Sequence, residues 1–166
     1  DGAASSNGKP GAMAGYGVYI INPDIPNISM PVDKIKHNQT NQVSELLAIY
    51  HGIKQIAYYH EKNEKNENHD VGKLKLVIYT DSQYAINSLT KWIINWKQNN
   101  WMNTKKKTVI HKELIQDIDN MSNNMNIEYR HVRSHQKKPT DIDSHDYFVW
   151  FGNNEADKLA VAGIDN

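Results

Sequence analysis

The sequence contains no cysteine, and this absence excludes disulfide bonds and thiolate metal ligands. Chains without cysteine are more typical of intracellular proteins, and this is the location we expect. An excess of one charge is also absent, since 19 lysines and arginines balance 19 aspartates and glutamates. The net charge therefore predicts no nucleic-acid partner by itself, and any basic binding surface must be local.

Long apolar segments are missing as well. No run approaches the roughly 20 residues that a membrane-spanning helix needs. At 166 residues, the chain is long enough for one domain with a sizeable core. We therefore expect a single domain over residues 1–166.

A strand followed by a helix is predicted around Asp81. Residues 74–79, LKLVIY, are the branched and aromatic run of a buried strand, and helical sequence begins near Ser82. An aspartate at the C-terminal end of a buried strand faces the crevice where open α/β sheets hold their chemistry. The alternative is that Asp81 caps the following helix, a role that aspartate also fills well.

The rest of the pattern predicts a mixed α/β domain, with strands first and then strands alternating with helices. The further predicted elements are strands at 15–21 and 28–36, a helix at 43–59, a helix at 111–121, a strand at 127–132 and a short helix at 153–163. A solvated loop is predicted at 62–70, and a long loop of mixed composition at 133–152.

Four acidic residues fall where strands end or helices begin in this pattern. They are Asp1, Glu45, Asp81 and Asp157. Carboxylates brought together without partners repel one another, so such a cluster needs cations, and oxygen ligands favour Mg²⁺ or Mn²⁺ over zinc. Two such ions about 4 Å apart can promote hydrolysis of a phosphodiester. The sequence permits this convergence without proving it, and for Glu45 the alternative is favourable interaction with a helix dipole.

Tryptophans and lysines interleave over residues 91–107, KWIINWKQNNWMNTKKK. Tryptophans at this density usually belong to a core, and lysines usually lie on a solvated face. The mixture also suits a surface that stacks on bases or sugars and binds phosphates. Both interpretations stay open for this segment.

Five motifs, in order along the chain, resemble type 1 ribonuclease H. They are DG with the glycine-rich turn and GYGVYI, then TNQVSELLAI, YTDSQYAINSLTKWIINWKQNNW, HVRSHQ and GNNEADKLA. The resemblance implies a ribonuclease H-like fold, with a five-stranded mixed sheet, antiparallel first three strands and helices on both faces. It also implies endonucleolytic hydrolysis of the RNA strand of RNA/DNA hybrids, leaving 5′-phosphate and 3′-hydroxyl ends. We expect a monomer.

The resemblance assigns roles to the acidic residues and to a histidine. The ligands of two Mg²⁺ ions, for which Mn²⁺ can substitute, would be Asp1, Glu45, Asp81 and Asp157. His135, within HVRSHQ, would move a proton or help the product leave, because its side chain titrates near neutral pH. Without the resemblance, an exposed loop histidine is the favoured interpretation of His135.

The resemblance also assigns residues to the substrate. Thr40, Asn41 and Gln42 would reach the minor groove and a DNA phosphate, where the 2′-hydroxyl distinguishes RNA from DNA. The DNA strand would be held by a basic protrusion at 91–107. Its proposed contacts are Trp92, Trp96, Lys105, Lys106 and Lys107, with His111 beside them in a phosphate pocket.

Four features depart from the family pattern. An apolar strand usually leads into the first aspartate, and here a free α-amino group at Asp1 would lie beside the metals, so we expect the native chain to extend upstream. Val43 stands where a basic residue is usual, and His111 stands where asparagine is usual. The histidine predicts weaker or pH-dependent binding of a DNA phosphate. The loop between His135 and Asp157 is longer than usual.

That loop contains two further motifs. The segment DIDSHD at 141–146 could form a metal site, but a solvated acidic turn is the favoured interpretation. The aromatic run YFVWF at 147–151 could cover the core or dock a partner, and we favour the core.

Three alternatives to a single-domain, hybrid-cleaving enzyme remain at this point. The chain could be the ribonuclease H domain of a reverse transcriptase or replication polyprotein. It could be a non-catalytic hybrid-binding module, although a pure phosphate binder gains nothing from clustered negative charge. It could also be a resolvase or exonuclease with the same sheet, but the TNQ motif and the tryptophan–lysine segment favour the hybrid.

Overall fold

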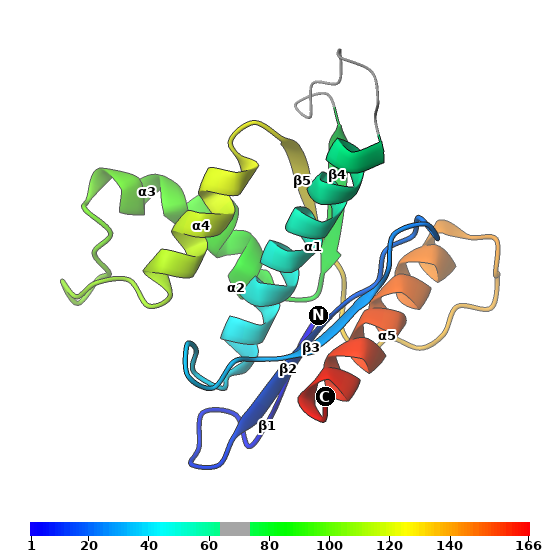
Figure 1. The fold of residues 1–166 in the computed structure, drawn as a ribbon, viewed down its shortest axis with the longest axis horizontal. Helices are drawn as coiled ribbons and strands as arrows, with labels where there is room; N and C mark the ends of the chain where they lie inside the picture. The colour runs from blue at the N-terminus through cyan, green and yellow to red at the C-terminus, as the bar shows by residue number, and fades with distance from the viewer. Residues whose placement is uncertain (64–73) are drawn as a thin grey trace.

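Two small sheets and two long helices form the frame of the molecule (Figure 1). The computed structural model describes residues 1–63 and 74–166. An antiparallel sheet is formed, in order, by β1 (Gly2–Ser5), β2 (Met13–Val18) and β3 (Ile28–Pro31). A second sheet pairs β4 (Lys75–Thr80) with β5 (Asn126–His131) in parallel.

Helices cover both faces of the three-stranded sheet. The helices are α1 (Asn41–Asn63), α2 (Gln83–Ile86), α3 (Ile93–Gln98), α4 (Lys112–Ser122) and α5 (His145–Ile164), with a π-helical segment η2 (Asn87–Trp92) between α2 and α3. Successive residues of β2 face opposite sides, as in any strand. Tyr16 packs in a cluster with Val43 and Leu47 of α1, whereas Gly17 lies against Ala160 of α5. The predicted mixed architecture, with antiparallel first strands and helices on both faces, is confirmed.

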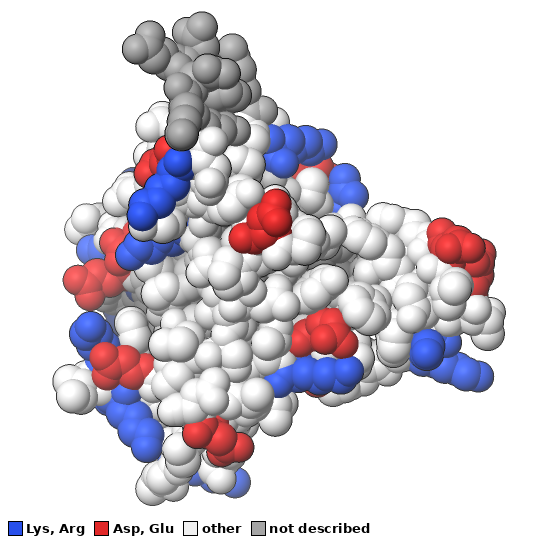
Figure 2. Space-filling view, turned by 45° about the vertical axis from the view of Figure 1, so that its right-hand side comes forward, with Lys and Arg blue, Asp and Glu red and all other residues white. Residues whose placement is uncertain are grey.

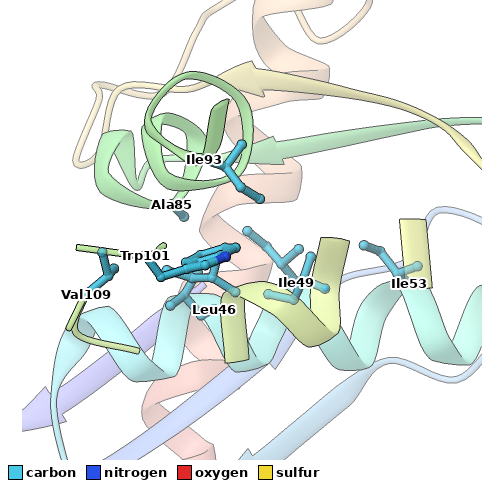
Figure 3. Packing of buried hydrophobic residues seen from close by; sticks show 9 residues of the cluster. Leu46, Ile49, Ile53, Ala85, Ile93, Trp101 and Val109 are labelled. Atoms are coloured by element: carbon cyan, nitrogen blue, oxygen red, sulfur yellow. The ribbon is translucent and has the colours of Figure 1, made fainter. Parts of the chain in front are cut away.

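A second core lies between α1 and the helices that follow β4. Leu46, Ile49 and Ile53 project from α1 toward this core (Figure 3). The buried residues that meet them are Ala85, Ile93, Trp101, Val109, Ile115 and Ile118. Trp101 is only 8% exposed, so the tryptophan–lysine segment reaches into the core through this ring.

The expected single sheet of five strands is found as sheets of three and two strands. A cavity of about 470 Å³ separates them, lined on one side by residues 17–22 and on the other by residues 76–80. Asp1 borders this cavity and lies near the centre of the molecule (Figure 1). Because β1 begins only at Gly2, the strand does not extend along β4, and among the described residues no ladder joins the two sheets.

Two predicted segments are shorter than expected. β3 ends at Pro31, and the chain then turns at Asp33, whose carboxylate accepts the amide of Ile35 at 2.8 Å. The predicted loop at 133–152 ends at Ser144, because its hydroxyl caps α5 by accepting the amide of Tyr147 at 3.1 Å. The loop predicted at 62–70 falls mostly outside the described residues.

The aromatic run at 147–151 therefore lies on α5, and its assignment to the core is wrong in part. Phe148 is 43% exposed and Phe151 is 37% exposed. Their rings make edge contacts, Phe148 with Tyr79 and Phe151 with Tyr19. No helix in the described ranges combines the length and the apolar character needed to cross a bilayer.

The close approach of β2 to α5 predicts the effect of a single methyl group. A Cβ at Gly17 would lie 2.6 Å from the carbonyl oxygen of Ala156 and from Cβ of Leu159. Gly17→Ala is expected to lower the free energy of unfolding by about 2 kcal/mol, because sheet and helix must separate. Gly152→Ala is the matched control, since its Cβ would meet the ring of Tyr19 at an ordinary 3.7 Å. Urea denaturation of both variants measures this, and equal stabilities would contradict the packing described.

Candidate active site

Asp1 is brought against α1 by the glycine that follows it. A Cβ at Gly2 would lie 2.5 Å from the backbone nitrogen of Glu45, so a larger residue would hold the strand away from the helix. The amino group of Asp1 donates to the carbonyl of Gly17 at 2.7 Å, and the amide of Gly17 donates back to the Asp1 carbonyl at 2.9 Å. These contacts hold Asp1 beside Glu45.

Glu45 is carried by the second turn of α1. The first turn starts at Asn41, and the hydroxyl of Thr40 accepts the amide of Val43 at 3.3 Å. Glu45 is 8% exposed and faces inward. The alternative role of Glu45, a favourable interaction with the helix dipole from the first turn, is wrong, because α1 has no acidic residue in its first turn.

Asp81 follows the last residue of β4, as predicted. The hydroxyl of Thr80 accepts the amide of Ser82 at 3.1 Å, and the hydroxyl of Ser82 accepts the amide of Ala85 at 3.1 Å. Ser82 is therefore the cap of α2. The alternative that Asp81 caps the helix is wrong, and its carboxylate is left available for the site.

Three of the four predicted carboxylates converge. Asp1, Glu45 and Asp81 each offer an oxygen atom, and these oxygens lie within 4.8 Å of one another. Oε2 of Glu45 is buried and has no hydrogen-bond partner among the described residues. A buried carboxylate oxygen without a donor is costly unless a cation neutralises it. The donor set is entirely oxygen, and it therefore fits Mg²⁺ or Mn²⁺.

The surroundings of Glu45 change its acidity. The pKa of Glu45 is raised to about 7, mainly by burial, with the neighbouring carboxylates of Asp81 and Asp157 acting in the same direction and the α-amino group of Asp1 opposing them. A carboxyl group that is half protonated near neutral pH is easily ionised by a bound cation. The site therefore favours divalent cations electrostatically.

Asp157 and His135 lie beside this cluster without belonging to the group of three. Asp157, on α5, lines a small pocket of about 40 Å³ together with Asp81 and His135. His135 is exposed and has a left-handed backbone, with φ of 54°. The structure thus brings the predicted histidine and the fourth predicted carboxylate to the edge of the carboxylate cluster.

The tryptophans of the protrusion form a row from surface to core. The ring of Trp96 lies 6.0 Å from that of Trp92 and 5.9 Å from that of Trp101. Trp92 is 37% exposed, whereas Trp101 is buried. The core and surface interpretations therefore both hold, at opposite ends of the row. The exposed lysines at 105–107 lie on a turn, in which the backbone amides of Lys105 and Lys107 donate to Oδ1 of Asn103.

The other predicted substrate residues lie at the starts of two helices. Thr40, Asn41 and Gln42 open α1, and the amide of Asn41 donates to Oδ1 of Asn7 at 3.0 Å. His111 precedes α4 with φ of 64°, and burial lowers the pKa of its imidazole. Because its pKa is lowered, His111 stays neutral to a lower pH than an ordinary histidine. The pH-dependent binding of a DNA phosphate that the sequence predicts would therefore be confined to lower pH.

The acidic segment at 141–146 lies at the surface, as a turn over residues 141–144 that leads into the first residues of α5. Oδ1 of Asp141 accepts the amide of Asp143 at 3.0 Å, and the backbone carbonyl of Asp141 accepts the hydroxyl of Ser144 at 2.7 Å. Asp141 and Asp143 are exposed. This geometry agrees with the solvated turn that the sequence favoured.

Several residues of the small pocket were missed as site residues by sequence reasoning, and Trp150 makes the most specific contact among them. Trp150 lines the pocket with His135, and its indole nitrogen donates to the carbonyl of Gln136 at 3.2 Å. The signal was present in the aromatic run, but the run was assigned to the core. Only the early start of α5 turns this ring toward the loop.

Comparison with known proteins identifies relatives over the whole chain. The RNase H family model matches residues 1–165. Ribonuclease H1 of Mus musculus is 37% identical over 164 residues, which cover 98% of this chain and 48% of the mouse protein. A probable ribonuclease H of Acanthamoeba polyphaga mimivirus is 34% identical over 95% of this chain and 61% of its own length. The chain thus spans about half the length of the mammalian relative.

A solved structure shares the fold. The solution structure of the PFV RNase H domain has a TM-score of 0.64 and 25% sequence identity, covering 99% of this chain and 91% of that domain. This chain therefore resembles these proteins in both sequence and fold. The carboxylate cluster described above lies within that shared fold.

The raised pKa of Glu45 predicts how stability changes with pH in the absence of metal. The folded state retains a proton on Glu45 up to about pH 7, whereas the unfolded chain releases it near its ordinary value of 4.5. Stability should therefore fall as pH rises through this interval, by up to about 3 kcal/mol. Glu45→Gln should remove this loss.

Denaturation by urea in chelator, from pH 4.5 to 7.5, measures the effect in both proteins. Added Mg²⁺ should restore stability above pH 6 in the unmodified chain alone. The same pH profile in both proteins would contradict the burial and crowding described for Glu45.

Proposed function

Because this chain belongs to the RNase H family, we propose that it cleaves the RNA strand of RNA/DNA hybrids endonucleolytically, leaving 5′-phosphate and 3′-hydroxyl ends. The observation that carries the proposal is the convergence of Asp1, Glu45 and Asp81 around a buried, unpartnered carboxylate oxygen. Such a cluster repels a phosphodiester unless cations bind to it. A module that only bound hybrids would gain nothing from it, and this disfavours the non-catalytic alternative.

The RNase H family is metal-dependent, and we propose two Mg²⁺ ions for this chain, with Mn²⁺ as a substitute. Asp1, Glu45 and Asp81 would hold them, and Asp157 would complete the set from α5. When bound, the cations would activate the attacking water and stabilise the leaving 3′-oxygen. The chain itself contributes the fixed positions of the carboxylates, which come from four places: directly before β1, within α1, directly after β4 and within α5.

The exposed imidazole of His135 would exchange protons with solvent at the edge of this cluster, which suits proton transfer or product release. The starts of α1 and α4 would contact the two strands of the hybrid, Thr40, Asn41 and Gln42 in the minor groove and His111 at a DNA phosphate.

The protrusion would hold the DNA strand through its exposed end. Trp92 and Trp96 offer rings for stacking, and the three lysines at 105–107 offer positive charge. Acidic and basic side chains are interspersed on the face in Figure 2, without one broad patch of either sign. Binding of the hybrid would therefore depend on these local contacts rather than on the electrostatic field of the whole molecule. The chain would act as a monomer.

Cleavage of one end-labelled RNA strand tests this function. The strand is presented alone, in an RNA duplex and paired with DNA, with Mg²⁺, Mn²⁺ or chelator. We expect cutting of the hybrid alone, dependent on the cation. Asp81→Asn should reduce the rate about 100-fold or more, with hybrid binding largely retained, because it removes a charge needed by the cations.

The exposed Asp24→Asn is the matched control and should cut at the normal rate. Near-normal turnover by Asp81→Asn would reject the assignment of the site. Equal cleavage of all three substrates would reject the hybrid as the specific substrate.

We further propose that an extended apolar segment leading into Asp1 completes the fold. The backbone pairing of Asp1 with Gly17 directs the chain before Asp1 along residues 18–21, which line the cavity between the sheets. The opposite wall is β4, and apolar side chains such as Ile49, Ile53 and Ile78 also border the space. A strand here would bury apolar surface and pair with both sheets.

A fusion at the N-terminus tests this completion of the fold. Five alternating β-branched residues joined to Asp1 should slow hydrogen exchange of the β4 amides that point away from β5 by about tenfold or more. A five-residue glycine–serine extension is the control and should leave exchange unchanged. Equal exchange in both fusions would contradict the proposal. If only the apolar fusion cleaves hybrid, the strand and not the assigned chemistry limits the unextended chain.

A further inference from the structure

The loop between β5 and α5 holds His135 in an unusual conformation. Its φ of 54° lies in the left-handed region, which costs a residue with a side chain about 1–2 kcal/mol. Such conformations persist when the surrounding structure holds them in place. The contacts of this loop therefore bear directly on where the imidazole points.

A side chain of α5 anchors the loop next to this residue. The indole Nε1–H of Trp150 donates to the backbone carbonyl of Gln136 at 3.2 Å, across 14 positions of sequence. Gln136 directly follows His135. The hydrogen bond thus ties the backbone beside the left-handed residue to a helix that is packed on the three-stranded sheet.

The indole is itself held from two sides. The ring of Tyr147, one turn earlier on α5, lies 5.5 Å from the ring of Trp150. Nζ of Lys138, from the loop, lies 5.7 Å from the centre of the Trp150 ring, within the range of a cation–π interaction. Trp150 is half-buried by these neighbours, so its donor is presented to Gln136 in a defined direction.

The same ring borders the pocket at the carboxylate cluster. Trp150, His135, Asp81 and Asp157 all line the cavity of about 40 Å³. A shift of the loop away from α5 would therefore change the distance between the histidine and these carboxylates.

We propose that Trp150 is a positioning residue, whose indole N–H fixes the Gln136 backbone and thereby orients His135 toward Asp81 and Asp157. Its effect on turnover rests on the proposed cleavage of hybrids, in which His135 acts on the reacting groups. Its effect on the loop does not depend on that function.

Trp150→Phe tests the effect on turnover, because it removes the indole donor and keeps a smaller aromatic ring at the same place. We expect kcat to fall about tenfold with KM within twofold, since the change affects positioning and not binding. In a His135→Ala background, Trp150→Phe should cause no further loss. Phe148→Leu, on the same helix but in contact with Tyr79, is the control and should leave kcat unchanged. Effects of Trp150→Phe and His135→Ala that multiply would overturn the proposal.

Hydrogen exchange tests the same contact without any assay of activity. In the unmodified chain, the indole N–H of Trp150 should exchange several times more slowly than that of the exposed Trp92. In Trp150→Phe, the amides of residues 134–137 should exchange faster than in the unmodified chain, with an unchanged midpoint of thermal unfolding.

An unprotected Trp150 indole, or unchanged exchange in the loop, would overturn the proposal. If neither the unmodified chain nor the apolar fusion cleaves hybrids, the proposed function fails, and these exchange rates still decide whether Trp150 positions the loop.

Discussion

Three carboxylates whose oxygens lie within 4.8 Å of one another repel, and one of them, Glu45, is buried. The fold must supply the free energy that holds them together, or a cation must. The elements that meet at this point come from three distant parts of the chain: the start of β1, the second turn of α1 and the end of β4. Their packing is therefore coupled to the charge at the site, and cation binding should stabilise the whole domain as well as prepare it for chemistry.

α1 is the element that makes this convergence possible. One side of the helix, with Leu46, Ile49 and Ile53, packs against the elements that follow β4 (Figure 3). Another side, with Val43 and Leu47, packs against the three-stranded sheet. Glu45 lies between these two apolar surfaces and cannot move without disturbing either core. This arrangement explains why a costly buried carboxylate is held so firmly near the ends of β1 and β4.

Much of this arrangement was predictable from the sequence, because periodicity and buried runs are local signals. The strand before Asp81, the long helix that carries Glu45 and the helix near 111–121 all lie where the pattern predicted them. The split of the sheet was not predictable, because local patterns do not show which strands pair with one another. The start of α5 was missed, since the capping signal at Ser144 is embedded in an acidic segment that looked like a loop.

The site shows the same division between local and long-range information. The sequence indicated which acidic residues lie near the ends of strands and the starts of helices. The distance between Asp1 and Glu45, in contrast, depends on the tight contact between Gly2 and α1. Similarly, only the structure shows that Ser82 rather than Asp81 caps α2, and that Trp150 faces the loop of His135. Distances between elements are set by packing, which no local pattern contains.

The converged carboxylates are expected to form a divalent-cation site. Paramagnetic broadening of backbone amide signals by Mn²⁺ tests it most directly, with Glu45→Gln beside the unmodified chain. We expect broadening centred on Gly2, Glu45 and Asp81, reversed by excess Mg²⁺ and strongly reduced in the variant. Broadening centred on the acidic turn at 141–146, or none near Glu45, would contradict it.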